Sequence, residues 1–168
     1  EAFQKLKMGK NNKIFLELKG EAFKEQEERS YLSNKDSDDI ISFCVRPKGI
    51  KVISAFLGGD LSEELEKKGA KEARSFLLKK LKNVFGESID SHFGKAFITS
   101  WCTDPLSLGS YSFASPGGIK AREILSSPID QKIFFAGEAC SKNAYSTAHG
   151  AYLSGQSCAK KILNKAKS

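Results

Sequence analysis

The chain has 168 residues, of which 40% are hydrophobic and 28% charged, the balance of a soluble globular protein with one domain or parts of two. It has no apolar run of about 18 residues, so no membrane-spanning segment is expected. The net charge of +7 comes mostly from lysines at 67–82 and 160–167, which are not interleaved with aromatic residues. We expect these lysines on solvated helix faces, with a functional basic surface as the alternative, and no nucleic-acid partner.

The cysteines, Cys44, Cys102, Cys140 and Cys158, are widely spaced and form no C-x-x-C pair. This spacing is typical of reduced thiols, and we expect a cytoplasmic protein. Two histidines are available as imidazole ligands, too few to favour a metal site, so none is predicted. The chain begins with Glu1 and no signal-like segment follows, which favours a start inside a longer protein.

The first half of the chain has strand and turn patterns. Residues 12–19 alternate apolar and polar side chains toward their end, which predicts a strand. Residues 20–39 are polar and are expected to form a surface loop or a weak helix. Residues 40–46 and 50–57 predict two further strands. Pro47-Lys48-Gly49 joins them into an antiparallel hairpin, because proline presets φ and glycine accepts a positive φ.

The clearest helical pattern covers residues 62–85. Apolar side chains recur there at steps of three or four, which places them on one face of a helix. Ser62 is the expected N-cap, and Gly86 is the expected terminating glycine. Residues 96–101 then predict another strand. Residues 102–120 are rich in proline and glycine and predict a long loop.

The last third combines an apolar segment, a glycine turn and a helix. Residues 133–136 are wholly apolar, as in a strand buried on both faces. Gly137-Glu138 follows as a tight turn that can offer a backbone N–H and a carboxylate to a ribose or ribitol. Residues 148–164 predict a helix with rows of small side chains, whose first N–H groups can approach a phosphate or a polarised carbonyl. These are the needs of a large nucleotide cofactor.

Five motifs occur in order along nearly the whole chain. They are Met8-Gly9 with Asn12-Lys13-Ile14, Trp101-Cys102-Thr103-Asp104-Pro105, Gly109-Ser110-Tyr111-Ser112, Phe134-Phe135-Ala136-Gly137-Glu138 and Thr147-Ala148-His149-Gly150. Their order and spacing resemble the C-terminal portion of the flavin-dependent amine oxidases, the family of monoamine oxidases, polyamine oxidases and histone lysine demethylases. The resemblance implies an α+β fold with part of an FAD/NAD(P)-binding domain. Residues 1–100 would belong to the antiparallel-sheet substrate domain, and residues 101–168 to the C-terminal portion of the FAD-binding domain.

The resemblance assigns Lys13 to hold a water near flavin N5, where an ammonium can orient water for proton or oxygen chemistry. The alternative is an exposed lysine at a strand start. Trp101 would pack beside the isoalloxazine ring, a role compatible with that of a core indole. Tyr111 would form one wall of an aromatic cage that attracts the substrate amine, the alternative being a half-buried loop tyrosine.

Two positions depart from the monoamine oxidases. Thr147 stands where those enzymes carry the second aromatic wall, as in the demethylase-like branch, which implies a more open pocket at the catalytic site. Ser110 stands where they carry the cysteine that bonds to the flavin. A serine cannot form that thioether, so non-covalent FAD is expected.

Six residues are expected to contact the cofactor: Trp101 and Thr147, described above, and Gly137, Glu138, Ala148 and His149. By resemblance, the N–H of Gly137 and the carboxylate of Glu138 meet the ribityl–pyrophosphate part. The alternative for Glu138 is an acid at a helix N-terminus. Ala148 and His149 would aim backbone N–H groups at the flavin C2 carbonyl, and this helix end would stabilise negative charge on the reduced flavin. For His149, a structural role is favoured over a catalytic side chain.

The G-x-G-x-x-G fingerprint that usually binds a pyrophosphate does not occur in the chain. We therefore expect a C-terminal portion that holds one side of a flavin site and does not bind FAD tightly alone. Because an incomplete domain exposes apolar surface, association with itself or with the missing N-terminal portion is expected.

The implied activity is FAD-dependent oxidation of a small-molecule amine. A hydride equivalent passes to flavin N5, the imine hydrolyses, and dioxygen reoxidises the flavin to give hydrogen peroxide. One alternative is a related flavin desaturase or porphyrinogen-type oxidase, against which the Asn12-Lys13 context argues. The other is a catalytically silent remnant or interaction domain.

Overall fold

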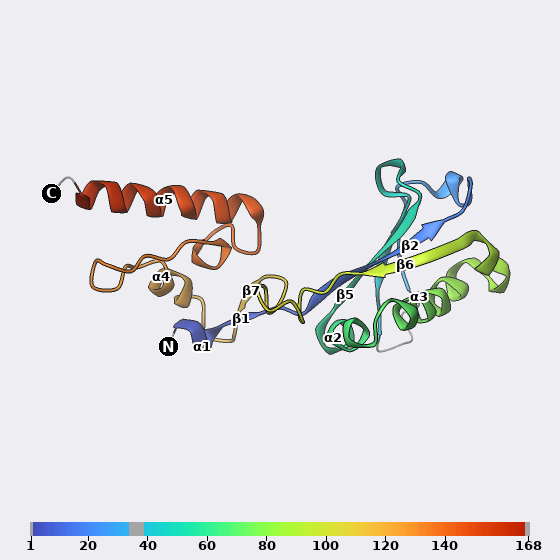
Figure 1. The fold of residues 1–168 in the computed structure, drawn as a ribbon, viewed down its shortest axis with the longest axis horizontal. Helices are drawn as coiled ribbons and strands as arrows, with labels where there is room; N and C mark the ends of the chain where they lie inside the picture. Colours follow the sequence, from blue (N-terminus) through green and yellow to red (C-terminus); the bar gives the residue numbers. More distant parts are fainter. Residues whose placement is uncertain (1, 34–38, 167–168) are drawn as a thin grey trace. The chain divides into compact units, whose positions relative to one another are not determined.

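The computed structural model describes residues 2–33 and 39–166 of the chain. They divide into two compact units, one formed by Lys10–Ser110 and the other by Glu1–Gly9 together with Tyr111–Ser168 (Figure 1). This division differs from the expected boundary after residue 100. The first nine residues join the C-terminal unit, because their strand pairs with one that follows Tyr111.

The unit of residues 10–110 is built on a five-stranded antiparallel sheet with the order β3-β4-β5-β2-β6. The strands are β2 (Asn11–Leu18), β3 (Ser30–Leu32), β4 (Ser42–Val45), β5 (Val52–Gly58) and β6 (Phe93–Ile98). The predicted strand at 12–19 and the predicted hairpin are confirmed as β2 and as β4 with β5. The hairpin turn contains a 3₁₀ helix, η2 (Pro47–Gly49).

Two helices, α2 (Gly59–Lys68) and α3 (Ala70–Phe85), cover one face of this sheet (Figure 1). Alternate side chains of β2 point to that face, so Ile14 and Leu16 are fully buried. Leu77 and Leu81 of α3 are also fully buried. Burying each such side chain contributes about 1.5–3 kcal/mol relative to leaving it exposed. The pattern of apolar steps therefore predicted the core face of α3 correctly.

The predicted single helix over 62–85 is wrong in two respects. Gly69 adopts a φ of 83° and separates α2 from α3, because this left-handed backbone cannot continue a helix. In addition, α2 begins at Gly59, so Ser62 lies inside the helix instead of capping it. Gly86, with a φ of 91°, ends α3 as expected, and its N–H donates to Lys82 O at 2.9 Å.

The predicted strand at 96–101 is displaced, because β6 ends at Ile98. Beyond it, the N–H of Trp101 turns to the side-chain oxygen of Asn12 at 3.3 Å. Within the predicted loop or weak helix at 20–39, the structure has a 3₁₀ helix, η1 (Lys24–Gln26), and β3. Residues 34–38 of that prediction lie outside the described part of the chain.

The other unit contains short elements and one long helix. They are α1 (Ala2–Lys5), β1 (Leu6–Met8), β7 (Ser112–Ala114), α4 (Ala121–Leu125), the 3₁₀ helix η4 (Glu138–Cys140) and α5 (Ala148–Ala166). Strand β1 pairs antiparallel with β7, so the predicted loop at 102–120 contains a strand that its composition concealed. The predicted helix at 148–164 is confirmed as α5. No described helix is long and apolar enough to cross a membrane.

The predicted buried strand at 133–136 is not observed. Ile133 forms an isolated bridge with Ile129 and is 53% exposed. A strand buried on both faces needs neighbouring strands, and no described strand pairs with this segment. The buried apolar cluster of this unit comprises Ala2, Ala121 and Leu125, a small core for a unit of this size.

Candidate functional site

In the sheet unit, the carboxylate of Glu66 joins the start of β2 to the loop after β6. It accepts hydrogen bonds from Asn12 Nδ2 at 2.5 Å, Cys102 N at 3.1 Å, Thr103 N at 2.7 Å and Thr103 Oγ1 at 2.5 Å. Asn12 and Glu66 are only 2% and 8% exposed. The cluster thus fixes the loop that carries Trp101 against the strand that carries Lys13.

These contacts set the protonation of Glu66. Burial alone would raise the pKa of its carboxyl, but the hydrogen bonds from Thr103, Asn12 and Cys102 outweigh burial and hold the pKa below its ordinary value. The neighbouring Cys102 thiol has a raised pKa, because of burial first and the nearby Glu66 carboxylate second. Glu66 is therefore an ionised structural acceptor, and sequence reasoning missed it because an acid on a lysine-rich helix gives no signal.

The backbones of Lys13 and Thr99 pair closely at this point. Lys13 N donates to Thr99 Oγ1 at 2.9 Å, and Thr99 N donates to Lys13 O at 3.0 Å. The Lys13 side chain is exposed on the sheet face opposite the helices, across the strand pair from Phe56. The indole of Trp101 is 48% exposed, so it is not a core residue. Both side chains are available to a ligand.

In the other unit, the carboxylate of Glu138 is the centre of a hydrogen-bond network. Its Oε1 accepts from Ser112 N at 2.8 Å, and its Oε2 accepts from Ser112 Oγ at 2.9 Å and Ser146 N at 2.7 Å. A carboxylate has about four lone-pair sites, so the described residues leave one acceptor site at Oε1. Glu138 begins η4, as the helix-terminus alternative requires, but it also binds residues distant in sequence.

A buried cation backs this network. Arg122 is 3% exposed, donates to Ser112 Oγ at 2.7 Å and to Ala139 O at 3.2 Å, and lies 4.3 Å from the ring centroid of Tyr145. The guanidinium and the Glu138 carboxylate are thereby linked through one serine hydroxyl, which compensates both charges. Sequence reasoning missed Arg122 and Ser146. Ser112 belongs to the motif Gly109-Ser110-Tyr111-Ser112, but the sequence does not show that it binds Glu138.

Gly137 is held by α5. Its N–H donates to Ser154 Oγ at 2.8 Å, and that hydroxyl donates back to Gly137 O at 2.8 Å. A cofactor contact at the Gly137 N–H would therefore compete with Ser154. The φ of Gly137 is 144°, a conformation that favours glycine.

The start of α5 is capped by Thr147. The Thr147 hydroxyl donates to Ala144 O at 2.6 Å and accepts from Gly150 N at 3.1 Å. Helix geometry leaves the first N–H groups, those of Ala148 and His149, without an intrahelical partner, and both residues are exposed. A Cβ at Gly150 would lie 1.8 Å from Ala144 O, so this helix start requires glycine.

Tyr111 lies in the same unit as Glu138 and Thr147. Its ring is half-buried, and its carbonyl accepts from Gly9 N at 2.7 Å, where β1 and β7 meet. The unit thus brings together Tyr111, Gly137, Glu138, Thr147, Ala148 and His149. N–H groups without an intrahelical partner, on exposed residues at a helix N-terminus, and a carboxylate with a remaining acceptor site fit a cofactor that carries hydroxyls and a polarised carbonyl.

Residues 1–163 match the profile of the family described as flavin containing amine oxidoreductase. The chain belongs to this family, and the family implies a flavin cofactor. The expected family and the α+β fold class are confirmed.

Particular relatives differ in the substrates that their names state. The chain is 30% identical over 190 residues to the human peroxisomal N(1)-acetyl-spermine/spermidine oxidase, covering 98% of this chain and 37% of that protein. It is 34% identical over 121 residues to the Arabidopsis thaliana lysine-specific histone demethylase 1 homolog 2, covering 70% and 16%. The solved structure of cyclohexylamine oxidase from Brevibacterium oxydans has the same fold, with a TM-score of 0.72 at 19% identity, covering 98% and 37%. The chain thus spans well under half of each relative.

Proposed function

We propose that this chain is the C-terminal portion of an FAD-dependent amine oxidase that acts on a small-molecule amine and forms hydrogen peroxide. The family match over residues 1–163 carries the proposal. The N–H groups of the exposed residues Ala148 and His149 at the start of α5 support it, since they suit a polarised carbonyl. A bound flavin would supply the chemistry by accepting two electrons from the amine and passing them to dioxygen.

The residues of the sheet unit have separate roles in this proposal. Lys13 presents its ammonium on the open face of the sheet and orients a water by hydrogen bonding. Trp101, half exposed and fixed through its backbone, offers an indole face against which a planar ring can lie. Both residues are positioned by the cluster of Asn12, Thr99 and Glu66.

The residues of the other unit bind and orient. Glu138 accepts a hydroxyl of the cofactor at Oε1, while Ala148 and His149 donate backbone N–H groups. Tyr111 forms one wall for the substrate amine. Thr147 has its hydroxyl engaged at the helix cap, so we assign it to positioning α5, and its small size keeps the pocket open.

Non-covalent attachment of FAD is part of the proposal. Ser110 has no thiol, and its hydroxyl accepts a hydrogen bond from Asn11 Nδ2 at 3.2 Å. We also propose a cytoplasmic protein, in which an N-terminal portion supplies the G-x-G-x-x-G unit. The segment at 133–136 pairs with no described strand, and Ile133 and Leu153 are exposed. Both features support a polypeptide partner for this unit, and self-association is the alternative.

The test compares Lys13→Met with Lys19→Met in the protein expressed with its upstream portion. Lys19 is also exposed and lies just beyond the far end of the same strand, so it controls for loss of charge. We expect a flavin absorption band in both variants, and amine-dependent hydrogen peroxide formation reduced at least about tenfold in Lys13→Met alone. Unchanged turnover in Lys13→Met would remove Lys13 from the mechanism. A protein without any flavin band would contradict the proposed function.

A further inference from the structure

Two cysteines lie where α5 packs on the turn after Gly137. Ser154 of α5 hydrogen-bonds both backbone groups of Gly137, which sets the register between the two segments. Cys158 follows Ser154 by one helical turn, and Cys140 follows Gly137 by three residues of 3₁₀ structure. Each step advances about 6 Å along its segment. Both cysteines therefore lie one helical turn beyond the shared contact of Ser154 with Gly137.

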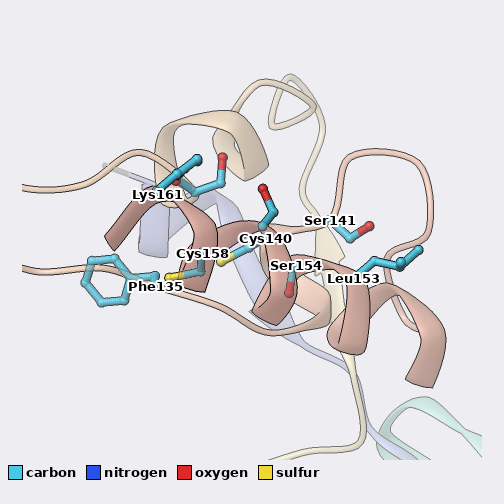
Figure 2. A pocket seen from close by; sticks show the side chains of 9 residues that line it. Phe135, Cys140, Ser141, Leu153, Ser154, Cys158 and Lys161 are labelled. Carbon is cyan, nitrogen blue, oxygen red and sulfur yellow. Dashed lines mark hydrogen bonds between the residues drawn. The ribbon is translucent and has the colours of Figure 1, made fainter. Parts of the chain in front are cut away.

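Both thiols line one cavity of about 240 Å³. Its other walls include Phe135, Leu153 and Lys161, and Figure 2 shows Cys140 and Cys158 among the side chains that line it. Each cysteine is half-buried, so a small oxidant can reach the sulfurs. The two segments thus present a pair of free thiols to the same small space.

The charges around the pair are mixed. Burial raises the pKa of the Cys140 thiol, and the neighbouring Cys158 and Glu138 add to this effect, while Lys161 and Arg122 oppose it. Cys140 therefore stays protonated at neutral pH. Lys161 lies three residues after Cys158 on the same face of α5 and lines the same cavity.

We propose that Cys140 and Cys158 are a modification site, a thiol pair that hydrogen peroxide oxidises to a disulfide joining η4 to α5. The thiolate of Cys158 attacks the peroxide, forms an S–O bond and releases hydroxide, which takes up a proton to become water. Cys140 then forms the S–S bond, and the sulfenic oxygen leaves as a second water. The two thiols lose two electrons, and one hydrogen peroxide is reduced to two waters. This inference does not rest on the proposed amine oxidase function.

The disulfide would connect the segment that carries Glu138 to the helix that carries the Ala148 and His149 N–H groups. At present the hydrogen bonds between Ser154 and Gly137 hold these segments together. A covalent link one turn further along would restrict their separation. The oxidised protein is therefore expected to unfold at a higher temperature than the reduced protein.

The test treats the reduced native protein with hydrogen peroxide and counts free thiols. We expect the count to fall from four to two, with non-reducing peptide mapping joining the Cys140 peptide to the Cys158 peptide. Cys44 and Cys102 lie in the other unit and serve as internal controls that stay reduced. Peptides of Cys140 and Cys158 that are oxidised or alkylated separately, without a link, would overturn the proposal.

Single variants test the order of the steps. In Cys140→Ser, we expect a sulfenic acid at Cys158 that a dimedone probe labels, because no second thiol is present to displace it. In Cys158→Ser, we expect no link and little labelling at Cys140. Labelling of Cys140 in Cys158→Ser as strong as the labelling of Cys158 in Cys140→Ser would contradict the assignment of Cys158 as the first thiol. Non-reducing peptide mapping of the peroxide-treated protein without substitutions decides the proposal even where a variant fails to fold.

Discussion

Ser112 donates to both carboxylate oxygens of Glu138, with its N–H to Oε1 at 2.8 Å and its hydroxyl to Oε2 at 2.9 Å. The same hydroxyl accepts from Arg122 at 2.7 Å. One small side chain therefore connects a buried cation to the anion that we propose as a cofactor ligand. Removing it separates the two charges and leaves Arg122 short of a partner.

We expect Ser112→Ala to lower the free energy of unfolding by about 1.5–3 kcal/mol, the range for hydrogen bonds to charged groups. The matched control is Ser115→Ala, since the buried Ser115 hydroxyl has no hydrogen-bond partner among the described residues. Denaturant unfolding of both variants measures the difference. In the flavin-loaded protein, Ser112→Ala is also expected to raise the dissociation constant for FAD. Equal stability of the two variants would show that the network contributes nothing.

Glycines at two positions of α5 are expected to respond oppositely to alanine. A Cβ at Gly150 would lie 1.8 Å from Ala144 O, so Gly150→Ala must displace backbone and lower stability by more than about 2 kcal/mol. At Gly155 no atom lies within 4 Å of the added Cβ, so Gly155→Ala should stabilise by up to about 1 kcal/mol through helix propensity. Thermal unfolding compares the two variants. A stable Gly150→Ala protein would contradict the tight packing at the start of α5.

Ser62 separates the sequence-based prediction from the structure. As an N-cap, its replacement by alanine would cost about 1 kcal/mol. In the structure its hydroxyl is buried inside α2 without a partner among the described residues, so Ser62→Ala should instead stabilise by a few tenths to about 1 kcal/mol. The control is Ser75→Ala on the exposed face of α3. It measures the gain in helix propensity together with the loss of one exposed hydrogen bond, from Ser75 Oγ to Lys71 O. If Ser62→Ala lowers the free energy of unfolding, Ser62 acts as the helix N-cap that the sequence predicted.

Glu66 predicts a pH dependence. Its pKa is lowered in the folded state, so the unfolded chain binds its proton more readily. The ionised Glu66 carboxylate contributes fully to the free energy of unfolding at a pH above its pKa in the unfolded chain, about 4.3. This contribution is lost as the pH falls through the lower pKa of the folded protein. We expect Glu66→Gln to flatten the decline in stability below about pH 4 and to lower stability at neutral pH by about 1–3 kcal/mol.

The control for Glu66 is Glu72→Gln, an exposed carboxylate on α3. Unfolding free energies measured from neutral pH to acid give both profiles. If the unfolding free energy of Glu66→Gln falls with acid pH just as that of the unsubstituted protein does, the hydrogen bonds do not lower the pKa of this carboxyl.

Local patterns were sufficient for elements whose stability comes from their own residues. Periodicity identified the buried face of α3, Pro47-Lys48-Gly49 identified the hairpin of β4 and β5, and rows of small side chains identified α5. The break at Gly69 was missed, because a glycine inside an apolar pattern gives no local sign that its φ is positive. The three-residue strand β7 was missed too, because its pairing with β1 lies about a hundred residues away in sequence.

The sequence by itself determined the family and the identities of Lys13, Trp101, Glu138 and the α5 start, because motif order and spacing are properties of the chain. Tertiary structure alone decided what those groups are bonded to. It engaged the Thr147 hydroxyl in a helix cap, the Gly137 N–H with Ser154, and Glu138 with Ser112. The physical reason is that buried polar groups must find partners, and those partners come from segments that only folding brings together.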